Sequence, residues 1–146
     1  MVMPTNIVIA DLDEAEAIAE SSAPAQEWRG VELQGIDPPK IAMLHCILTG
    51  ESFEEAAAQY DPIYAGSGEG PWVIVVPHAP VAKLARLEEQ VMEQIGEEWA
   101  ATEDLEREHW PVDEVQAVVA ELAALASISI AQEKEMFIWI NEYVGA

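Results

Sequence analysis

The stretch of sequence that decides the fold class is PWVIVVPHAPVAKL, residues 71–84. Its first half is a continuous apolar run at 72–76, rich in β-branched residues and closed by a proline on each side, which predicts a buried strand. Its second half contains Pro80, which can open a helix, followed by apolar residues spaced three and four apart. We expect these residues to form one stripe along a helix: Val81, Leu84, Leu87, Val91, Ile95 and Trp99.

Three further segments predict strands, at residues 6–10, 28–34 and 136–140. The first is short and rich in β-branched residues, and the second is weakened by Gly30. The third, MFIWI, could also continue the helix before it, but its β-branched and aromatic content favours a strand.

Several segments carry helix signals. Asp37 is followed by two prolines, which predicts a helix that starts there and ends at Gly50. That helix is apolar nearly all round, so it should be buried on most faces. Shorter helices are predicted at 11–20 and 51–60, an acidic connector or helical turn at 102–110, and a long helix after Pro111.

These elements do not repeat as strand–helix–strand units, so a doubly wound sheet is not expected. No linker is long enough to divide the 146 residues, and this length suits one ordinary domain. We therefore predict a single acidic α+β domain over residues 1–146, rich in helix, with a small sheet of short strands.

The chain is strongly acidic. It has 28 Asp and Glu against 6 Lys and Arg, a formal net charge of −22, while 51% of its residues are hydrophobic. The hydrophobic content predicts a folded protein rather than a disordered polyanion. The charge excludes nucleic acids and anionic membranes as partners and leaves a basic protein as a natural one.

Other features predict a soluble cytoplasmic protein. The N-terminus lacks the basic and apolar regions of a signal peptide, and no uninterrupted apolar run approaches the length of a membrane helix. The single cysteine, Cys46, cannot form an intramolecular disulfide, which fits a reducing compartment.

The densest acid lies between residues 88 and 108, where Arg107 is the only base. Two interpretations stay open, a solvated helix face and a docking surface for a basic partner. The carboxylates are Glu88, Glu89, Glu93, Glu97, Glu98, Glu103, Asp104, Glu106 and Glu108.

Catalytic candidates are few. His45 stands next to Cys46, but adjacent helix residues do not share a face, so we expect a buried or half-buried histidine with a hydrogen-bond partner. His78 lies where the predicted strand becomes a helix. An enzyme would therefore place its site around His45 and residues 66–78. The glycine-rich turn at 66–70 precedes a strand instead of opening a helix, unlike a phosphate-binding loop.

No metal site and no cofactor are predicted. Glu106 and His109 stand three residues apart, the spacing at which two ligands on one helix can share a metal ion. A second pair of that kind is missing from the sequence pattern.

The motif LHCILTG at 44–50, the glycine turn leading into 71–84, a long amphipathic helix and an apolar C-terminal segment together resemble the YfbM-like family of bacterial proteins. That family is known as a domain of unknown function, and the resemblance begins at about Gly35. It implies a small cytoplasmic α+β domain, and it carries over no catalytic residues because the family has none established. Ile41 and the Gly70-Pro71-Trp72 segment depart from the pattern common in the family.

No motif identifies a reaction, and we favour a role without catalysis. The first hypothesis is a protein-binding module, an inhibitor or immunity-type protein, that engages a basic partner through the acid at 88–108. The second is a small enzyme with its site around His45 and residues 66–78. The third attributes the acidity to salt adaptation of a whole proteome.

Overall fold

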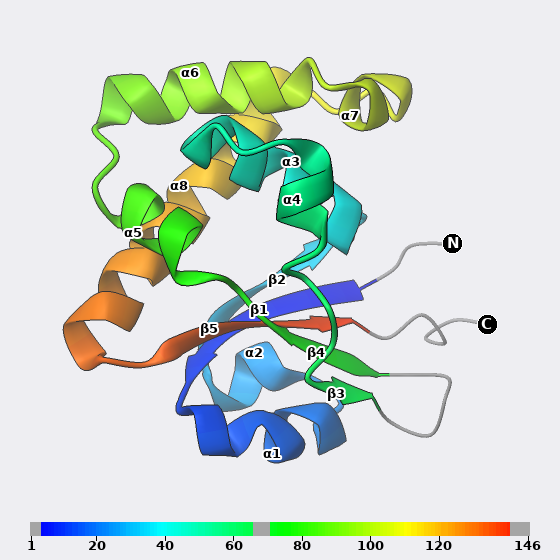
Figure 1. The fold of residues 1–146 in the computed structure, drawn as a ribbon, viewed down its shortest axis with the longest axis vertical. Helices are drawn as coiled ribbons and strands as arrows, with labels where there is room; N and C mark the ends of the chain where they lie inside the picture. Colours follow the sequence, from blue (N-terminus) through cyan, green and yellow to red (C-terminus); the bar gives the residue numbers. More distant parts are fainter. Residues whose placement is uncertain (1–3, 66–70, 141–146) are drawn as a thin grey trace.

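The first and last of the predicted strands lie side by side near the centre of an antiparallel sheet (Figure 1). The computed structural model describes residues 4–65 and 71–140. The strand order is β2-β1-β5-β4-β3, and all neighbouring strands run antiparallel. The strands are β1 (Pro4–Ala10), β2 (Arg29–Gln34), β3 (Tyr64–Ala65), β4 (Trp72–Val75) and β5 (Glu135–Ile140).

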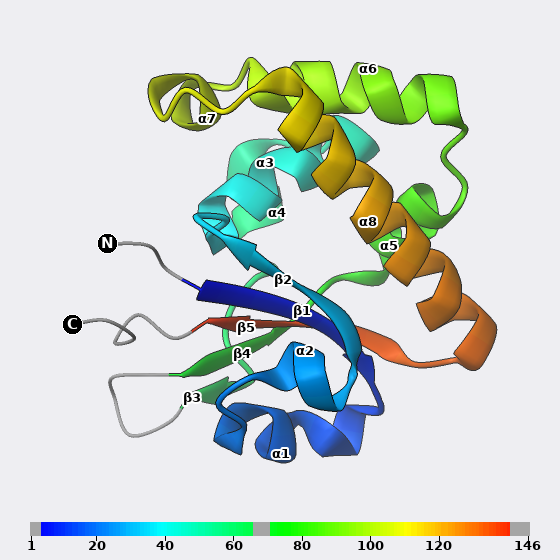
Figure 2. The same ribbon diagram turned by 180° about the vertical axis from the view of Figure 1, so that it is seen from behind.

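Helices cover both faces of the sheet, and a further pair forms an outer layer (Figures 1 and 2). One face carries α1 (Ala15–Glu20), preceded by a 3-10 turn at Leu12–Glu14, and α2 (Pro24–Glu27). The other carries α3 (Pro38–Thr49), α4 (Phe53–Ala57), α5 (His78–Ala85) and α8 (Val112–Gln132). The outer layer, which packs on α3 and α8, consists of α6 (Glu89–Ala100) and α7 (Glu103–Arg107).

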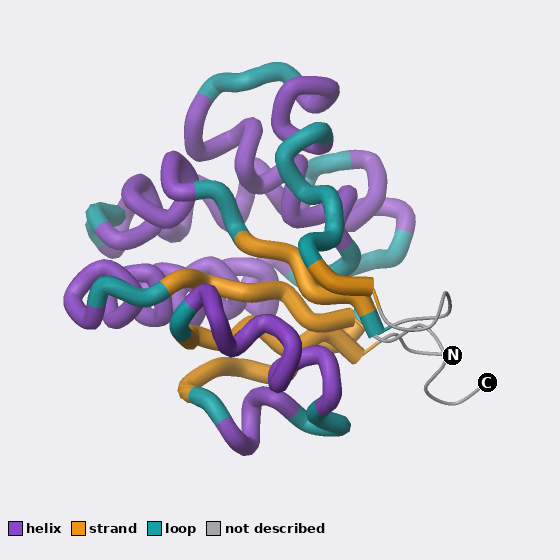
Figure 3. Tube along the Cα trace, turned by 60° about the horizontal axis from the view of Figure 1, so that its bottom comes forward, coloured by secondary structure: helices purple, strands orange, loops and turns teal. Residues whose placement is uncertain are grey.

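The alternation of side chains along the strands divides the interior into two cores. On β5, Met136 and Ile138 enter the large core under α3, α5 and α8, whereas Phe137 and Trp139 enter the small core under α1 and α2. Because both faces of β5 are covered, its sequence over residues 136–140 is a continuous run of apolar residues instead of an alternating pattern. Figure 3 shows the strands enclosed between the two groups of helices.

The α+β prediction is confirmed, as are the four strands predicted from composition. The α3 helix begins where its sequence signal predicts, because Asp37 Oδ1 accepts a hydrogen bond from the backbone N–H of Lys40 at 3.0 Å. It ends at Gly50, whose φ of 81° places it in the left-handed region that favours glycine.

The prediction of one helix across the apolar stripe from Val81 to Trp99 is wrong. The α5 helix ends at Ala85, and α6 begins after an extended residue, Glu88. The reason is tertiary: Val81 packs in the large core beside the sheet, whereas Trp99 reaches that core from the outer layer. A single straight helix could not place Val81 beside the sheet and Trp99 in the outer layer, so the chain turns between α5 and α6.

The longest helix, α8, runs from the outer layer down to the start of β5 and packs against α5, α6 and the central strands β1 and β5 (Figure 2). By length and composition alone it could cross a membrane, since an 18-residue window has a mean hydropathy of 1.5. In the fold, 44% of that window is buried. The buried side chains of this helix, among them Val115, Val119 and Leu122, pack in the large core.

The α6 helix packs tightly against α8 at Gly96. A Cβ atom there would lie 2.5 Å from Gln116 Cγ and 2.9 Å from Gln116 Cα. We therefore expect Gly96→Ala to lower the free energy of unfolding by about 1–3 kcal/mol, because the two helices must separate. Urea denaturation followed by circular dichroism measures this. The exposed neighbour supplies the control: Gln94→Ala should change stability by less than about 0.5 kcal/mol. Equal effects of the two substitutions would contradict the close contact.

Candidate functional site

The acidic segment predicted as a docking surface lies on the outer layer of helices (Figure 1). The α6 helix buries Ile95, Gly96, Trp99 and Ala100 against the rest of the protein, so its carboxylates lie on the solvent side. We call the following residues the acidic face; all are exposed except Asp104, which is half-buried: Glu88, Glu89, Glu93, Glu97, Glu98, Glu103, Asp104 and Glu106.

Basic residues neutralise little of this face. Arg107 lies 2.9 Å from Glu103 Oε1 and 3.9 Å from Asp104 Oδ1, and both pairs are open to solvent. Such surface pairs contribute about 0–1 kcal/mol each to stability. Among the described residues, no lysine or arginine lies within salt-bridge distance of the other carboxylates of the face. The face therefore presents a nearly uniform negative charge.

Glu108, the ninth predicted carboxylate, has a different environment. Its side chain is half-exposed, but its carboxylate lies 2.7 Å from the ammonium of Lys40, a residue that is only 4% exposed. The hydrogen bond from Lys40, reinforced by one from Trp110, lowers the pKa of Glu108 below its ordinary value. Glu108 is therefore exposed but already paired with Lys40, and we do not count it in the acidic face.

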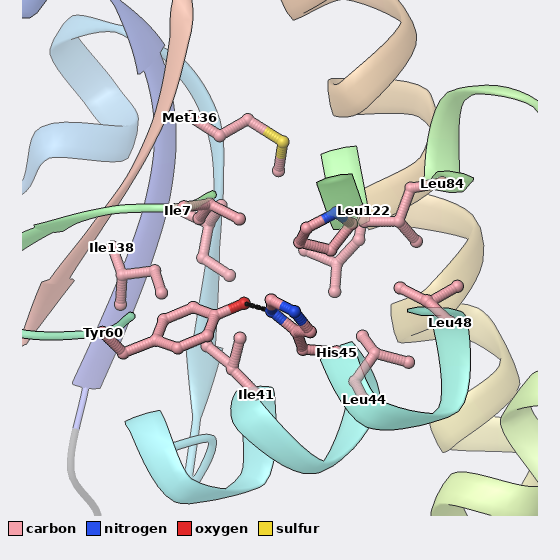
Figure 4. A pocket seen from close by; sticks show the side chains of 12 residues that line it. Ile7, Ile41, Leu44, His45, Leu48, Tyr60, Leu84, Leu122, Met136 and Ile138 are labelled. Carbon is pink, nitrogen blue, oxygen red and sulfur yellow. Dashed lines mark hydrogen bonds between the residues drawn. The ribbon is translucent and has the colours of Figure 1, made fainter. Parts of the chain in front are cut away.

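His45 is buried in the large core, as expected, with partners on both ring nitrogens. Its Nε2 lies 2.7 Å from Glu51 Oε1. Its Nδ1 lies 2.9 Å from the hydroxyl of Tyr60, as Figure 4 shows. A carboxylate only accepts, so Nε2 carries the proton of the neutral ring and Nδ1 accepts from the tyrosine. Burial raises the pKa of Tyr60, which keeps its hydroxyl protonated as a donor.

A small cavity of about 20 Å³ lies beside His45 and Tyr60 (Figure 4). This space admits about one water molecule. Small-molecule sites are far larger, roughly 300–1,000 Å³. The cavity is therefore a packing defect of the core and offers no room for a substrate. Its remaining walls are aliphatic apart from one thioether: Ile7, Ile41, Leu44, Leu48, Val76, Pro80, Leu84, Leu122, Met136 and Ile138.

The two catalytic candidates occupy separate places. His78, the first residue of α5, has a side chain that is 84% exposed, and its Nε2 lies 2.9 Å from Glu135. It lines a surface hollow with Lys134 and Ile130, whereas His45 lines the internal cavity. The glycine-rich turn at 66–70 lies outside the described residues. Within the described part of the chain, the structure forms no common site from His45 and His78.

In the described part of the chain, Glu106 and His109 are not joined by further side chains that could complete a metal site. His109 follows α7 with a φ of 59°, and both side chains are exposed. Among residues 4–65 and 71–140, no three His, Cys, Asp or Glu side chains are grouped as a metal ion would require. Cys46 is half-buried, and burial raises the pKa of its thiol, which opposes nucleophilic chemistry.

Sequence reasoning missed three residues of these networks: Lys40, Glu51 and Tyr60. A lysine inside an otherwise apolar helix was a usable signal, because a buried ammonium requires a carboxylate partner. Glu51 and Tyr60 carried no such signal. The contact of Glu51 with His45 depends on the turn that follows Gly50, and the contact of Tyr60 depends on how α4 folds back along α3.

The His45 network predicts a pH dependence. The hydrogen bond from His45 lowers the pKa of Glu51 in the folded state below its ordinary value of 4.5. The stabilisation from Glu51 is therefore complete above that value and is lost as the pH falls through the lowered folded-state pKa. We expect Glu51→Gln to destabilise the protein at about pH 7 and to have a smaller effect near pH 3.

Urea denaturation of both proteins across this pH range measures the difference. Glu54→Gln is the matched control, because it removes an exposed carboxylate from the neighbouring helix. A Glu51→Gln effect that stays constant with pH, or that equals the control, would show that the His45 contact does not bias the protonation of Glu51.

Comparison with known proteins gives no further assignment. No protein-family model matches the chain, and no curated protein or solved structure matches it. The resemblance to the YfbM-like family therefore stays a prediction from the motifs of the sequence.

Proposed function

We propose that this protein is a binding module that engages a basic protein through the acidic face, as an inhibitor or immunity-type neutraliser does. The observation that supports this most is the composition of the outer helical layer. Its exposed carboxylates are opposed by one base, Arg107, which already pairs within the face. The proposal includes a cytoplasmic location.

Electrostatic repulsion between carboxylates on α6 destabilises the free protein, and a cationic partner would reduce that repulsion. Glu89, Glu93 and Glu97 follow one another at intervals of four on α6, so they are neighbours on the helix surface. Each like-charged pair at this spacing destabilises a helix by about 0.2–0.5 kcal/mol. Cations brought close to these carboxylates would remove the repulsion, and the field of the face would accelerate the encounter.

The face is also held in a fixed shape. The α6 helix is anchored by Trp99, which is fully buried, and α7 by Leu105, which is fully buried as well. Carboxylates on packed helices lose less entropy on binding than those of a disordered acidic tail. Such preorganisation favours recognition of a folded partner over loose attraction to any polycation.

The test compares two variants with equal charge. E93Q/E97Q/E106Q removes three charges from the acidic face, and D13N/E16Q/E20Q removes three exposed charges near α1. Lysozyme and cytochrome c serve as folded basic probes, with the dissociation constant measured at several salt concentrations. We expect the wild type to bind with an affinity that falls as salt rises, and the first variant to bind more weakly than the second.

Equal weakening by both variants would overturn the proposal, because it would show attraction to the net charge alone. That result would favour salt adaptation of the proteome as the origin of the acidity. Binding that does not respond to salt, or no binding by the wild type, would also overturn the proposal.

A further inference from the structure

We propose that Lys40 is a positioning residue whose buried ammonium holds the segment at residues 101–110 and thereby sets the geometry of the acidic face. This inference rests on the proposed function for its consequence in binding. Its structural part stands independently. Lys40 lies in the first turn of α3, whereas the segment that it holds carries Glu103, Asp104 and Glu106.

The contacts of the Lys40 ammonium join parts of the chain that are far apart. Its Nζ donates to the backbone carbonyl of Gly35 at 2.6 Å and to the carboxylate of Glu108, 68 residues away, at 2.9 Å to Oε1. Asp37 Oδ2 lies at 3.7 Å and adds a second negative charge. The ammonium thus links the turn before α3 to the residue after α7.

Two tryptophans add further contacts between the outer layer and the start of α3. Trp110 Nε1 donates to Glu108 at 3.2 Å, and its ring lies against Gly35, since a Cβ on that glycine would be 3.4 Å from Trp110 Cζ2. Trp99 Nε1 donates to the backbone carbonyl of Lys40 at 2.9 Å. Both ends of the outer layer's last segment are therefore fastened to the same turn of α3.

The Lys40–Glu108 ion pair is weak evidence for stability, because the ammonium is buried and its desolvation offsets much of the attraction, while Glu108 is half-exposed. The position of Glu108 nevertheless matters, since without it the nearest carboxylate to the buried ammonium is that of Asp37 at 3.7 Å. Apolar packing by Leu105 could hold α7 in several orientations. The Lys40 contact selects one of them, which is why we assign it a positional role.

The proposal and long-range electrostatics predict opposite signs. Lys40→Met makes the protein more negative by one charge, so attraction alone would strengthen binding of a basic probe. If Lys40 positions the acidic face, the same substitution should weaken lysozyme binding by about threefold or more. Lys83→Met is the matched control, because it removes an exposed lysine from α5 and should leave binding unchanged or slightly stronger.

A second readout does not depend on any partner. The amides of Glu106, Glu108 and Trp110 donate to backbone carbonyls of residues 102, 104 and 105. Hydrogen exchange at these amides should become about fivefold faster or more in Lys40→Met and stay near the wild-type rate in Lys83→Met. Should Lys40→Met fail to fold, Glu108→Gln provides a second test, with Glu54→Gln as its equal-charge control because Glu54 is exposed and lies outside the acidic face.

The outcomes separate the two proposals. If exchange accelerates as expected but wild-type lysozyme binding does not depend on the acidic face, the positional role of Lys40 holds and the proposed function fails. Suppose instead that the acidic face binds lysozyme, but that Lys40→Met matches Lys83→Met in both lysozyme binding and hydrogen exchange. The inference about Lys40 is then overturned. The same conclusion follows if Glu108→Gln, used in its place, matches Glu54→Gln.

Discussion

Replacing Trp99 by alanine is expected to lower the free energy of unfolding by about 3–5 kcal/mol, the typical result for deleting a buried aromatic side chain. Trp99 is 0% exposed and lies where α6 meets the large core. Its loss would leave a large cavity and would deprive the Lys40 carbonyl of its donor. Since domains are stable by only about 5–15 kcal/mol, this variant should be close to unfolding.

Urea denaturation followed by circular dichroism measures the loss of unfolding free energy. Two further variants serve as comparisons. Trp99→Phe keeps most of the ring but removes the donor, so it should cost about 1–3 kcal/mol. Trp72→Ala truncates a half-buried tryptophan in β4 and should cost less than Trp99→Ala. A cost of Trp99→Ala below about 1 kcal/mol would show that the outer helix is not anchored through Trp99.

The second large effect is expected at His45. His45→Leu leaves the buried hydroxyl of Tyr60 without its partner and should destabilise the protein by about 2–3 kcal/mol. Tyr60→Phe leaves Nδ1 of His45 without a donor and should cost about 1–3 kcal/mol. The double variant removes both groups, so its cost should fall short of the sum by about 1 kcal/mol or more.

A thermodynamic cycle of these three variants, measured by urea denaturation, gives the coupling energy directly. His78→Leu provides the comparison, since it removes an imidazole that is largely exposed and should change stability by at most about 0.5 kcal/mol. Strict additivity of His45→Leu and Tyr60→Phe would mean that their 2.9 Å contact does not contribute to the folded state.

Local signals in the sequence were sufficient for most of the fold. Asp37 with its two prolines located the start of α3, Gly50 its end, and the apolar run at 72–76 located β4. These features act through backbone geometry within a few residues, so they can be recognised without knowledge of the tertiary structure. The choice of strand for the MFIWI segment succeeded because β5 is buried on both faces.

Contacts between distant segments could not be predicted in this way. The break between α5 and α6 follows from packing in two layers, while the apolar spacing continues across it. The same holds for the pairing of Lys40 with Glu108. Glu108 is exposed like its acidic neighbours, and nothing in the acidic run indicates that this carboxylate is the one that meets the buried ammonium of Lys40.

The strand order has a consequence for the chain as it emerges from the ribosome. β5 is the last strand in the described sequence, but it lies between β1 and β4 and joins the two halves of the sheet. Until residues 135–140 have been synthesised, the facing edges of β1 and β4 have no partner. Exposed strand edges invite association between chains. With 28 acidic residues in the full sequence, most of them already synthesised by then, unfinished chains repel one another during that interval.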